Sequence, residues 1–180
     1  ELVASAEHTL STTYTDASPT VAELYPKLAD AVQEINSNRF APATAILMHP
    51  RRWGFLTAGV DSSNRPLVLP AGNNPDNAAG VGEAAAYGQV VGSVLGLPVI
   101  TDANITTTDG GGSDQDQIYV VKADDHILFE DNLFQLKFEE TNAGSLTTKM
   151  VVYGYVAFAS GRYPTGITKI QGTGLITPSF

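Results

Sequence analysis

The sequence predicts an α+β fold in which a mixed sheet with flanking helices carries a long, protruding β-hairpin. Apolar residues between positions 21 and 35 recur at three- and four-residue steps, which is typical of an amphipathic helix. Short, mostly apolar runs at 45–48, 97–100 and 118–121 have the length and character of buried strands. Between 134 and 139, apolar and polar residues alternate, which indicates a strand with one apolar face.

The predicted helix begins at Thr20 and ends near positions 36–38. Its apolar stripe consists of Val21, Leu24, Leu28, Ala31, Val32 and Ile35. Thr20 and Glu23 have the spacing of a capping box, in which the hydroxyl and the carboxylate each reach a free amide of the first turn. Pro26 lies off the apolar stripe, so we expect only a bend on the solvent side. Residues 1–19 form a Ser/Thr-rich lead-in segment with one short strand.

The middle of the chain alternates between short elements and two long polar loops. Pro50 follows the first buried strand and suits the first position of a short helix, which has Trp53 and Leu56 on one face. The loops are expected at 70–89 and 102–116, and loops of this length usually serve function or interaction.

A hairpin is expected after a further short strand at 127–129. The alternating strand leads to turn residues at 141–145 and then to an apolar run at 147–159, which is long for a strand of a compact domain. Residues 162–165 end this run, and the last strand of the sheet is expected at 167–170.

Composition and motifs exclude several classes of function. The 180-residue chain has no cysteine, which rules out disulfides, thiolate metal sites and cysteine nucleophiles. Its formal net charge is −9 and its ten Lys and Arg residues are scattered, with one adjacent pair at Arg51–Arg52. We therefore expect no specific nucleic-acid site. No run of 18 apolar residues occurs, so we expect no membrane association.

Acidic clusters offer weak signals for catalysis or metal binding. Asp109, Asp114 and Asp116 flank a glycine run but lack the spacing of an EF-hand loop. The sequence at 124–126, Asp-Asp-His, is expected to be a solvated turn, because consecutive turn residues point in divergent directions. No catalytic constellation is found, so we expect no enzymatic activity, no cofactor and no metal.

Four segments, taken in order, resemble the major capsid protein of tailed bacteriophages with the HK97 fold. They are the helix from Thr20 with 43–53, then 95–105, then 116–121, and finally 157–167. The resemblance implies an axial domain formed by 20–132 and 165–180, and a peripheral-domain β-hairpin at 133–164. It also implies that the family's N-terminal arm, extended loop and spine helix would precede residue 1. Without them, this chain is not expected to close shells alone.

The implied function is that of a structural subunit of an icosahedral phage or prophage capsid. Its partners would be other copies of itself in hexamers and pentamers, with scaffold and portal proteins as further candidates. Its location would be the virion, and the host cytoplasm during assembly. Two alternatives stay open: an encapsulin-type bacterial compartment shell, which shares the fold, and a small acidic hydrolase or sugar-binding module built on the two long loops.

The candidate subunit-interface residues lie on the predicted hairpin. Phe134, Leu136 and Phe138 form the apolar face of its first strand. An isolated two-stranded ribbon is only marginally stable in water, so this face is expected to need a partner. The full set of candidates is Phe134, Leu136, Phe138, Thr141, Asn142, Gly144, Leu146, Arg162 and Tyr163.

Overall fold

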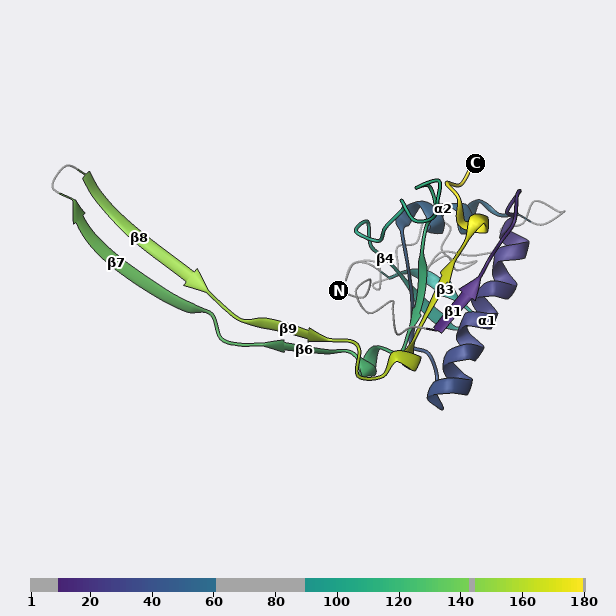
Figure 1. Ribbon diagram of the computed structural model, residues 1–180, viewed down its shortest axis with the longest axis horizontal. Helices are drawn as coiled ribbons and strands as arrows, with labels where there is room; N and C mark the ends of the chain where they lie inside the picture. Colours follow the sequence, from purple (N-terminus) through teal and green to yellow (C-terminus); the bar gives the residue numbers. More distant parts are fainter. Residues whose placement is uncertain (1–9, 61–89, 143–144, 180) are drawn as a thin grey trace, which may run out of the picture.

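The computed structural model describes residues 10–60, 90–142 and 145–179, and shows a mixed α/β body with a two-stranded ribbon projecting from it (Figure 1). The body contains one sheet and two helices, which confirms the predicted α+β class. The ribbon leaves the body at one end and extends well beyond it, so most of the ribbon has no other element beside it (Figure 1).

The body is built on a six-stranded mixed sheet. Its strand order is β1-β10-β5-β2-β4-β3, in which β1 pairs parallel with β10 and β2 pairs parallel with β4, while the other neighbours are antiparallel. The bounds are Leu10–Thr13 for β1, Ala45–Met48 for β2, Val90–Val94 for β3, Leu97–Thr101 for β4, Ile118–Val121 for β5 and Ile167–Gln171 for β10.

The two edge strands were predicted incompletely. Residues 10–13 form β1, the short strand expected in the lead-in segment, and its place beside β10 in the sheet was not predicted. Strand β3 was not predicted, although it forms a tight hairpin with β4. The turn between them uses Leu95 (φ 55°) and Gly96 (φ 77°). Positive φ at both positions is the geometry of the favoured two-residue hairpin turn, but leucine is an unusual residue for it, so the turn signal was weak.

Helix α1 (Val21–Arg39) packs on the sheet through the predicted apolar stripe. Leu24, Leu28, Ala31 and Ile35 are buried. At its N-terminus, a Glu23 carboxylate oxygen accepts hydrogen bonds from the Thr20 backbone amide at 2.9 Å and from the Thr20 hydroxyl at 2.6 Å. The carboxylate part of the predicted capping box is therefore formed. The helix ends at Phe40, which adopts a left-handed conformation.

Helix α2 (Pro50–Ala58) follows β2, as predicted. The His49 Nδ1 atom accepts a hydrogen bond from the Arg51 amide at 3.2 Å and so caps the helix. Leu56 is buried, and Trp53 packs against the core from the same helix. The predicted loop at 102–116 connects β4 to β5, whereas the predicted loop at 70–89 falls outside the described residues.

The sheet has apolar packing on both faces. Ile46 and Val120 face the main core with α1, whereas Leu47 and Tyr119 belong to a second cluster. This division follows from the alternation of side chains along a strand. Ile46 is fully buried at the centre of the sheet, between β4 and β5.

Replacing Ile46 with valine is expected to lower the free energy of unfolding by about 0.5–1.5 kcal/mol, because one buried methyl group is lost and a small cavity remains. Chemical denaturation of both chains measures the difference. The matched control is Val60→Ala, which removes methyl groups from a side chain that is 51% exposed. Equal midpoints for Ile46→Val and the wild-type chain would contradict the assignment of Ile46 to the core.

The ribbon is longer than predicted and consists of two ladders. At its base, β6 (Ile127–Glu130) pairs antiparallel with β9 (Val156–Ala159). Further out, β7 (Phe134–Asn142) pairs antiparallel with β8 (Ser145–Tyr153). The strand expected at 127–129 in the axial domain thus belongs to the ribbon, and the apolar run at 147–159 is divided at Gly154 and Tyr155. The ribbon therefore begins at residue 127 rather than at 133.

Candidate functional site

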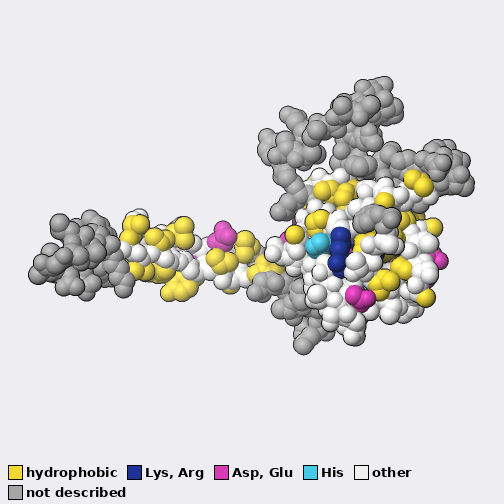
Figure 2. Space-filling model, turned by 90° about the horizontal axis from the view of Figure 1, so that it is seen from above, with side chains coloured by type: hydrophobic (Ala, Val, Ile, Leu, Met, Phe, Trp, Pro, Cys, Tyr) yellow, Lys and Arg dark blue, Asp and Glu magenta, His cyan; other side chains and the backbone are white. Residues whose placement is uncertain are grey.

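Exposed apolar side chains concentrate on the ribbon. In the described part of the chain, most of the large hydrophobic side chains that are exposed lie there, from Tyr153 at 39% to Leu133 at 77% exposed. Figure 2 shows these side chains along the described length of the ribbon. Contiguous apolar surface of this kind marks interaction sites on soluble proteins. The exposed large hydrophobic side chains of the ribbon are Leu128, Phe129, Leu133, Phe134, Leu136, Met150, Val152, Tyr153, Tyr155 and Val156.

One face of the outer ladder carries an aromatic cluster. Phe134 lies directly opposite Tyr153, and their rings stack with centroids 5.5 Å apart. Tyr155 meets Tyr153 edge to face at 6.1 Å. Leu136 follows on the same face of β7, opposite Val151. Directly opposed residues of an antiparallel pair share a face, so these side chains form one continuous apolar strip.

The opposite face of the outer ladder is also partly apolar. Val152 is 55% exposed and Met150 is 60% exposed. The register partner of Val152 is the polar residue Gln135. The Gln135 side-chain amide lies 2.7 Å from the Met150 sulfur. This face is therefore amphipathic, whereas the aromatic face is apolar over its described length.

The inner ladder exposes apolar groups on both faces as well. Phe129 and Leu128 point to opposite faces of β6 and are each more than half exposed. Where the two ladders meet, a shallow hollow of about 510 Å³ is lined by Phe129, Glu130, Asp131, Tyr155, Val156 and Ala157. Two carboxylates thus border an otherwise apolar hollow.

The structure places the predicted interface residues in two groups. Phe134 and Leu136 lie on the apolar strip and are 44% and 45% exposed. Phe138, Thr141, Asn142 and Leu146 lie in the outer ladder, where Thr141 is opposite Leu146 and Asn142 is opposite Ser145. Gly144 lies outside the described residues.

Arg162 and Tyr163 lie at the base of the ribbon, away from the apolar strip. The Arg39 guanidinium from the end of α1 lies over the Tyr163 ring, 4.1 Å from its centroid, and that of Arg162 lies 5.2 Å away. Tyr163 is thus held by cation–π contacts within the chain. Sequence patterns gave no sign of this contact, because Arg39 is distant in the sequence.

An ion pair between a buried aspartate and a partly exposed arginine also lies at the base of the ribbon and corrects the expected solvated turn at 124–126. The Arg39 guanidinium donates two hydrogen bonds to the Asp125 carboxylate, at 2.8 Å and 3.0 Å. The Asp125 side chain is only 5% exposed, in contrast to Asp124 at 77%. His126 stacks on Phe158 with its centroid 6.1 Å away. The turn is therefore a joint between α1 and the ribbon rather than a solvated loop.

The hydrogen bonds from Arg39 lower the pKa of Asp125 below its ordinary value, against the opposing effect of burial. This pair therefore stabilises the fold above the ordinary pKa of an aspartate, and the contribution is lost as the pH falls through the folded pKa.

In an Arg39→Gln variant, unfolding midpoints are expected to be lower than in the wild-type chain between about pH 5 and pH 8. The difference is expected to narrow as the pH falls below about 4, because the Asp125 carboxylate becomes protonated, and the part due to the Tyr163 contact remains. Denaturation at a series of pH values measures this narrowing. Lys27→Gln, which removes the same charge from another part of α1, is the control. A wild-type advantage over Arg39→Gln that has the same size at acidic and at neutral pH would contradict the proposed role of the pair.

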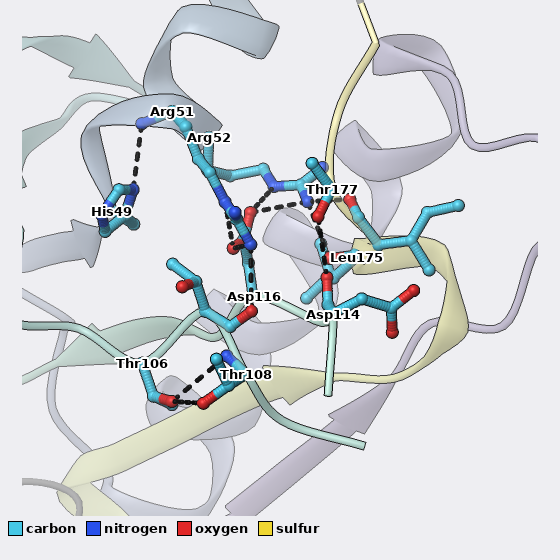
Figure 3. A network of polar contacts seen from close by, with 11 residues as sticks. His49, Arg51, Arg52, Thr106, Thr108, Asp114, Asp116, Leu175 and Thr177 are labelled. Carbon is cyan, nitrogen blue, oxygen red and sulfur yellow. Dashed lines mark hydrogen bonds and ion pairs between the residues drawn. The ribbon is translucent and has the colours of Figure 1, made fainter. Parts of the chain in front are cut away.

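A second ion cluster lies in the body, where two arginines share one buried carboxylate (Figure 3). Arg51 Nη2 lies 2.6 Å from Asp116 Oδ1, and Arg52 Nη2 lies 2.7 Å from Asp116 Oδ2. The side chains of Arg52 and Asp116 are both fully buried. Arg52 also donates to the backbone carbonyls of Leu175 and Ile176, at 2.8 Å and 2.6 Å. The cluster thus ties α2, the loop before β5 and the C-terminal segment together.

The contact between these three residues was not predicted from the sequence. Arg51 and Arg52 were noted as an adjacent basic pair, and Asp116 as a weak calcium candidate. In the structure, Asp116 is committed to the two arginines. Within 10–60, 90–142 and 145–179, no three His, Asp or Glu side chains are grouped as metal ligands would be. Neither helix among these residues has the length and apolar character needed to cross a membrane.

Comparisons with known proteins find similarity in structure rather than in sequence. A chain from Mycobacterium phage Che8 aligns with a TM-score of 0.53 and 12% identity, covering 94% of this chain and 56% of the phage chain. A chain from Gordonia phage Cozz aligns with a TM-score of 0.55 and 14% identity, covering 93% and 51%.

This chain thus spans about half the length of these phage chains. No model of a protein family matches it, and no curated protein sequence is similar to it. Nearly all of the chain, body and ribbon together, therefore has a fold that occurs in bacteriophage proteins.

Proposed function

We propose that this chain is part of the major capsid protein of a tailed bacteriophage with the HK97 fold, and that its ribbon is a contact between subunits. The observation that carries this proposal is the ribbon itself, a two-stranded element that projects from the body with exposed apolar side chains on both faces (Figures 1 and 2). The structural similarity to phage chains supports the phage origin of the fold.

The physical argument starts from the cost of leaving the ribbon exposed. Burial of apolar surface is worth about 25 cal/mol per Å², so the strip around Phe134, Leu136 and Tyr153 gains free energy on contact with another apolar surface. The body cannot supply that surface, because the ribbon extends away from it (Figure 1). A second copy of the same chain, or another part of the same assembly, fits the need.

In this proposal the body corresponds to the axial domain and the ribbon to the peripheral domain. Other copies of the subunit, arranged in hexamers and pentamers, are the main partners, and the virion is the final location. The rigid joint at the ribbon base, held by Arg39 and Asp125, would then fix the direction in which the ribbon reaches its neighbour. The proposal assigns no catalytic activity, cofactor or metal to the chain.

The test is to express the protein from its natural gene and to examine it by sedimentation velocity and negative-stain electron microscopy. Capsomers or closed icosahedral particles built from this protein are the expected result. A protein that stays monomeric at every concentration tested, in the presence of its natural scaffold, would overturn the proposal. Particles that enclose a cargo enzyme instead of DNA would favour the encapsulin alternative.

A further inference from the structure

The Arg52 guanidinium has an unused donor at a place where solvent hardly reaches. Its Nε atom donates to Asp116 at 2.9 Å, and its Nη2 atom donates to the carbonyls of Leu175 and Ile176. The remaining nitrogen, Nη1, is buried and has no hydrogen-bond partner. A buried donor without a partner is costly, and more so when it belongs to a charged group.

The charge around Arg52 is also unbalanced. Arg51 and Arg52 both pair with Asp116, so two positive charges share one negative charge. Burial lowers the pKa of Arg52, although Asp116 opposes this effect. An arginine keeps its proton in a protein, so the imbalance cannot be relieved by loss of a proton. A further negative group beside Arg52 would relieve it.

A cavity of about 310 Å³ lies against Arg52. Its wall is formed by the segment before α1, by α2 and by the C-terminal segment. Ser18, Thr177 and Ser179 bring polar groups to the cavity, and Phe55 brings an apolar wall. Because the other nitrogens of Arg52 are occupied, Nη1 is the donor that this side chain can offer there.

Two carboxylates lie near this region, Asp16 in the segment before α1 and Glu23 in the first turn of α1, and each has partners of its own. Asp16 accepts a hydrogen bond from the Ser18 amide at 2.8 Å. Glu23 accepts from Thr20, as described above. Both are close enough to Tyr14 to raise its pKa, after the larger effect of burial. Neither is hydrogen-bonded to Arg52 Nη1.

We infer that this cavity is a binding site for a small oxyanion, with carboxylate or phosphate oxygens accepting from Arg52 Nη1 and from the hydroxyls of Ser18 and Ser179, since the Thr177 hydroxyl already donates to the Asp114 carbonyl. Guanidinium groups bind both classes of oxygen with charge-assisted hydrogen bonds. The oxyanion has two sources, a free ion or an acidic side chain of another copy of the chain. The inference does not depend on the proposed capsid function.

The experiment measures the Tm of the wild-type chain at increasing concentrations of inorganic phosphate. The control is sodium chloride at the same ionic strength and pH. A saturable rise in Tm of about 3–10 °C is expected at phosphate concentrations ten to a hundred times the dissociation constant. A Tm that does not respond to phosphate beyond the chloride control overturns the inference.

Two variants make the test specific to the cavity. Ser18→Glu places a carboxylate at the cavity wall, so the variant is expected to lose the response to phosphate. Ser37→Glu adds the same charge on an exposed part of α1 and is expected to keep the full response. A full phosphate response in Ser18→Glu would place the anion elsewhere and contradict the inference.

Sedimentation velocity then distinguishes the two sources of the oxyanion. If an acidic side chain of another copy normally occupies the cavity, saturating phosphate competes with it and reduces self-association of the wild-type chain. If a free ion is the ligand, phosphate raises Tm and leaves self-association unchanged. Both results support an oxyanion site and differ only in its source.

Discussion

Replacing Asp116 with asparagine is expected to lower the free energy of unfolding by about 3–5 kcal/mol, which is among the largest effects of any single substitution in this chain. Asparagine has nearly the same shape, so packing changes little. The substitution removes the carboxylate with which Arg51 and Arg52 both pair, and the Arg52 side chain has no exposure to solvent. The cost is therefore that of leaving a buried positive charge without its counter-ion.

A matched control exists two positions away. Asp114 is exposed, and Asp114→Asn removes the same charge from the same loop. Its effect is expected to stay within about 0.5 kcal/mol, as for most surface substitutions. Urea denaturation of the three proteins compares them directly. If Asp116→Asn and Asp114→Asn unfold at similar urea concentrations, the cluster contributes little and its assigned role is wrong.

The interior of the body was predictable because each of its elements carries a strong local pattern. The apolar stripe of α1 runs from Val21 to Ile35, and β2 and β5 are uninterrupted apolar runs. Such patterns depend only on which face is buried. The edge strands lack them: β1 is the polar run Leu-Ser-Thr-Thr, and β3 is interrupted by glycine and serine. Their pairing with β10 and β4 comes from tertiary contact.

The ribbon was predictable in part for the same reason. The alternation at Phe134 and Leu136 marks a strand with one apolar face. The extension to β6 was missed because Ile127 and its neighbours read equally well as a strand of the main sheet. Only the pairing of β6 with β9 decides between the two placements.

The polar contacts could not have been read from the sequence. Arg51 and Asp116 are 65 positions apart, and Arg39 and Asp125 are 86 positions apart. No spacing rule relates residues at such distances, since their meeting depends on the order of strands in the sheet. The unpartnered nitrogen of Arg52 and the cavity beside it follow from the same long-range geometry.

The double variant Phe134→Ser, Leu136→Ser is expected to leave the body folded and to abolish assembly of the protein expressed from its natural gene. Both side chains are already nearly half exposed, so their loss costs the isolated subunit little. At an interface, truncation of a central apolar anchor lowers the binding free energy by about 1–2 kcal/mol or more. A shell repeats each contact in every subunit, so two such losses per contact are enough to prevent it from closing.

Two comparisons identify which surface makes the contact. Met150→Ser with Val152→Ser changes the amphipathic face of the same ladder, where both side chains are also exposed. Phe40→Ser removes the most exposed large hydrophobic side chain of the described body, which is 91% exposed and lies at the end of α1 rather than on the ribbon. The aromatic face is expected to be the contact, so the first control retains partial assembly and the second assembles normally.

The assembly defect has to be separated from local unfolding of the ribbon, because a two-stranded ribbon is marginally stable on its own. Hydrogen exchange of the β7 and β8 amides, measured in the unassembled subunits, makes this distinction. If the double variant keeps wild-type exchange rates in these strands and fails to assemble, the apolar strip itself is the contact. If it assembles normally, the ribbon is not a subunit contact, and the exposed apolar side chains serve another partner.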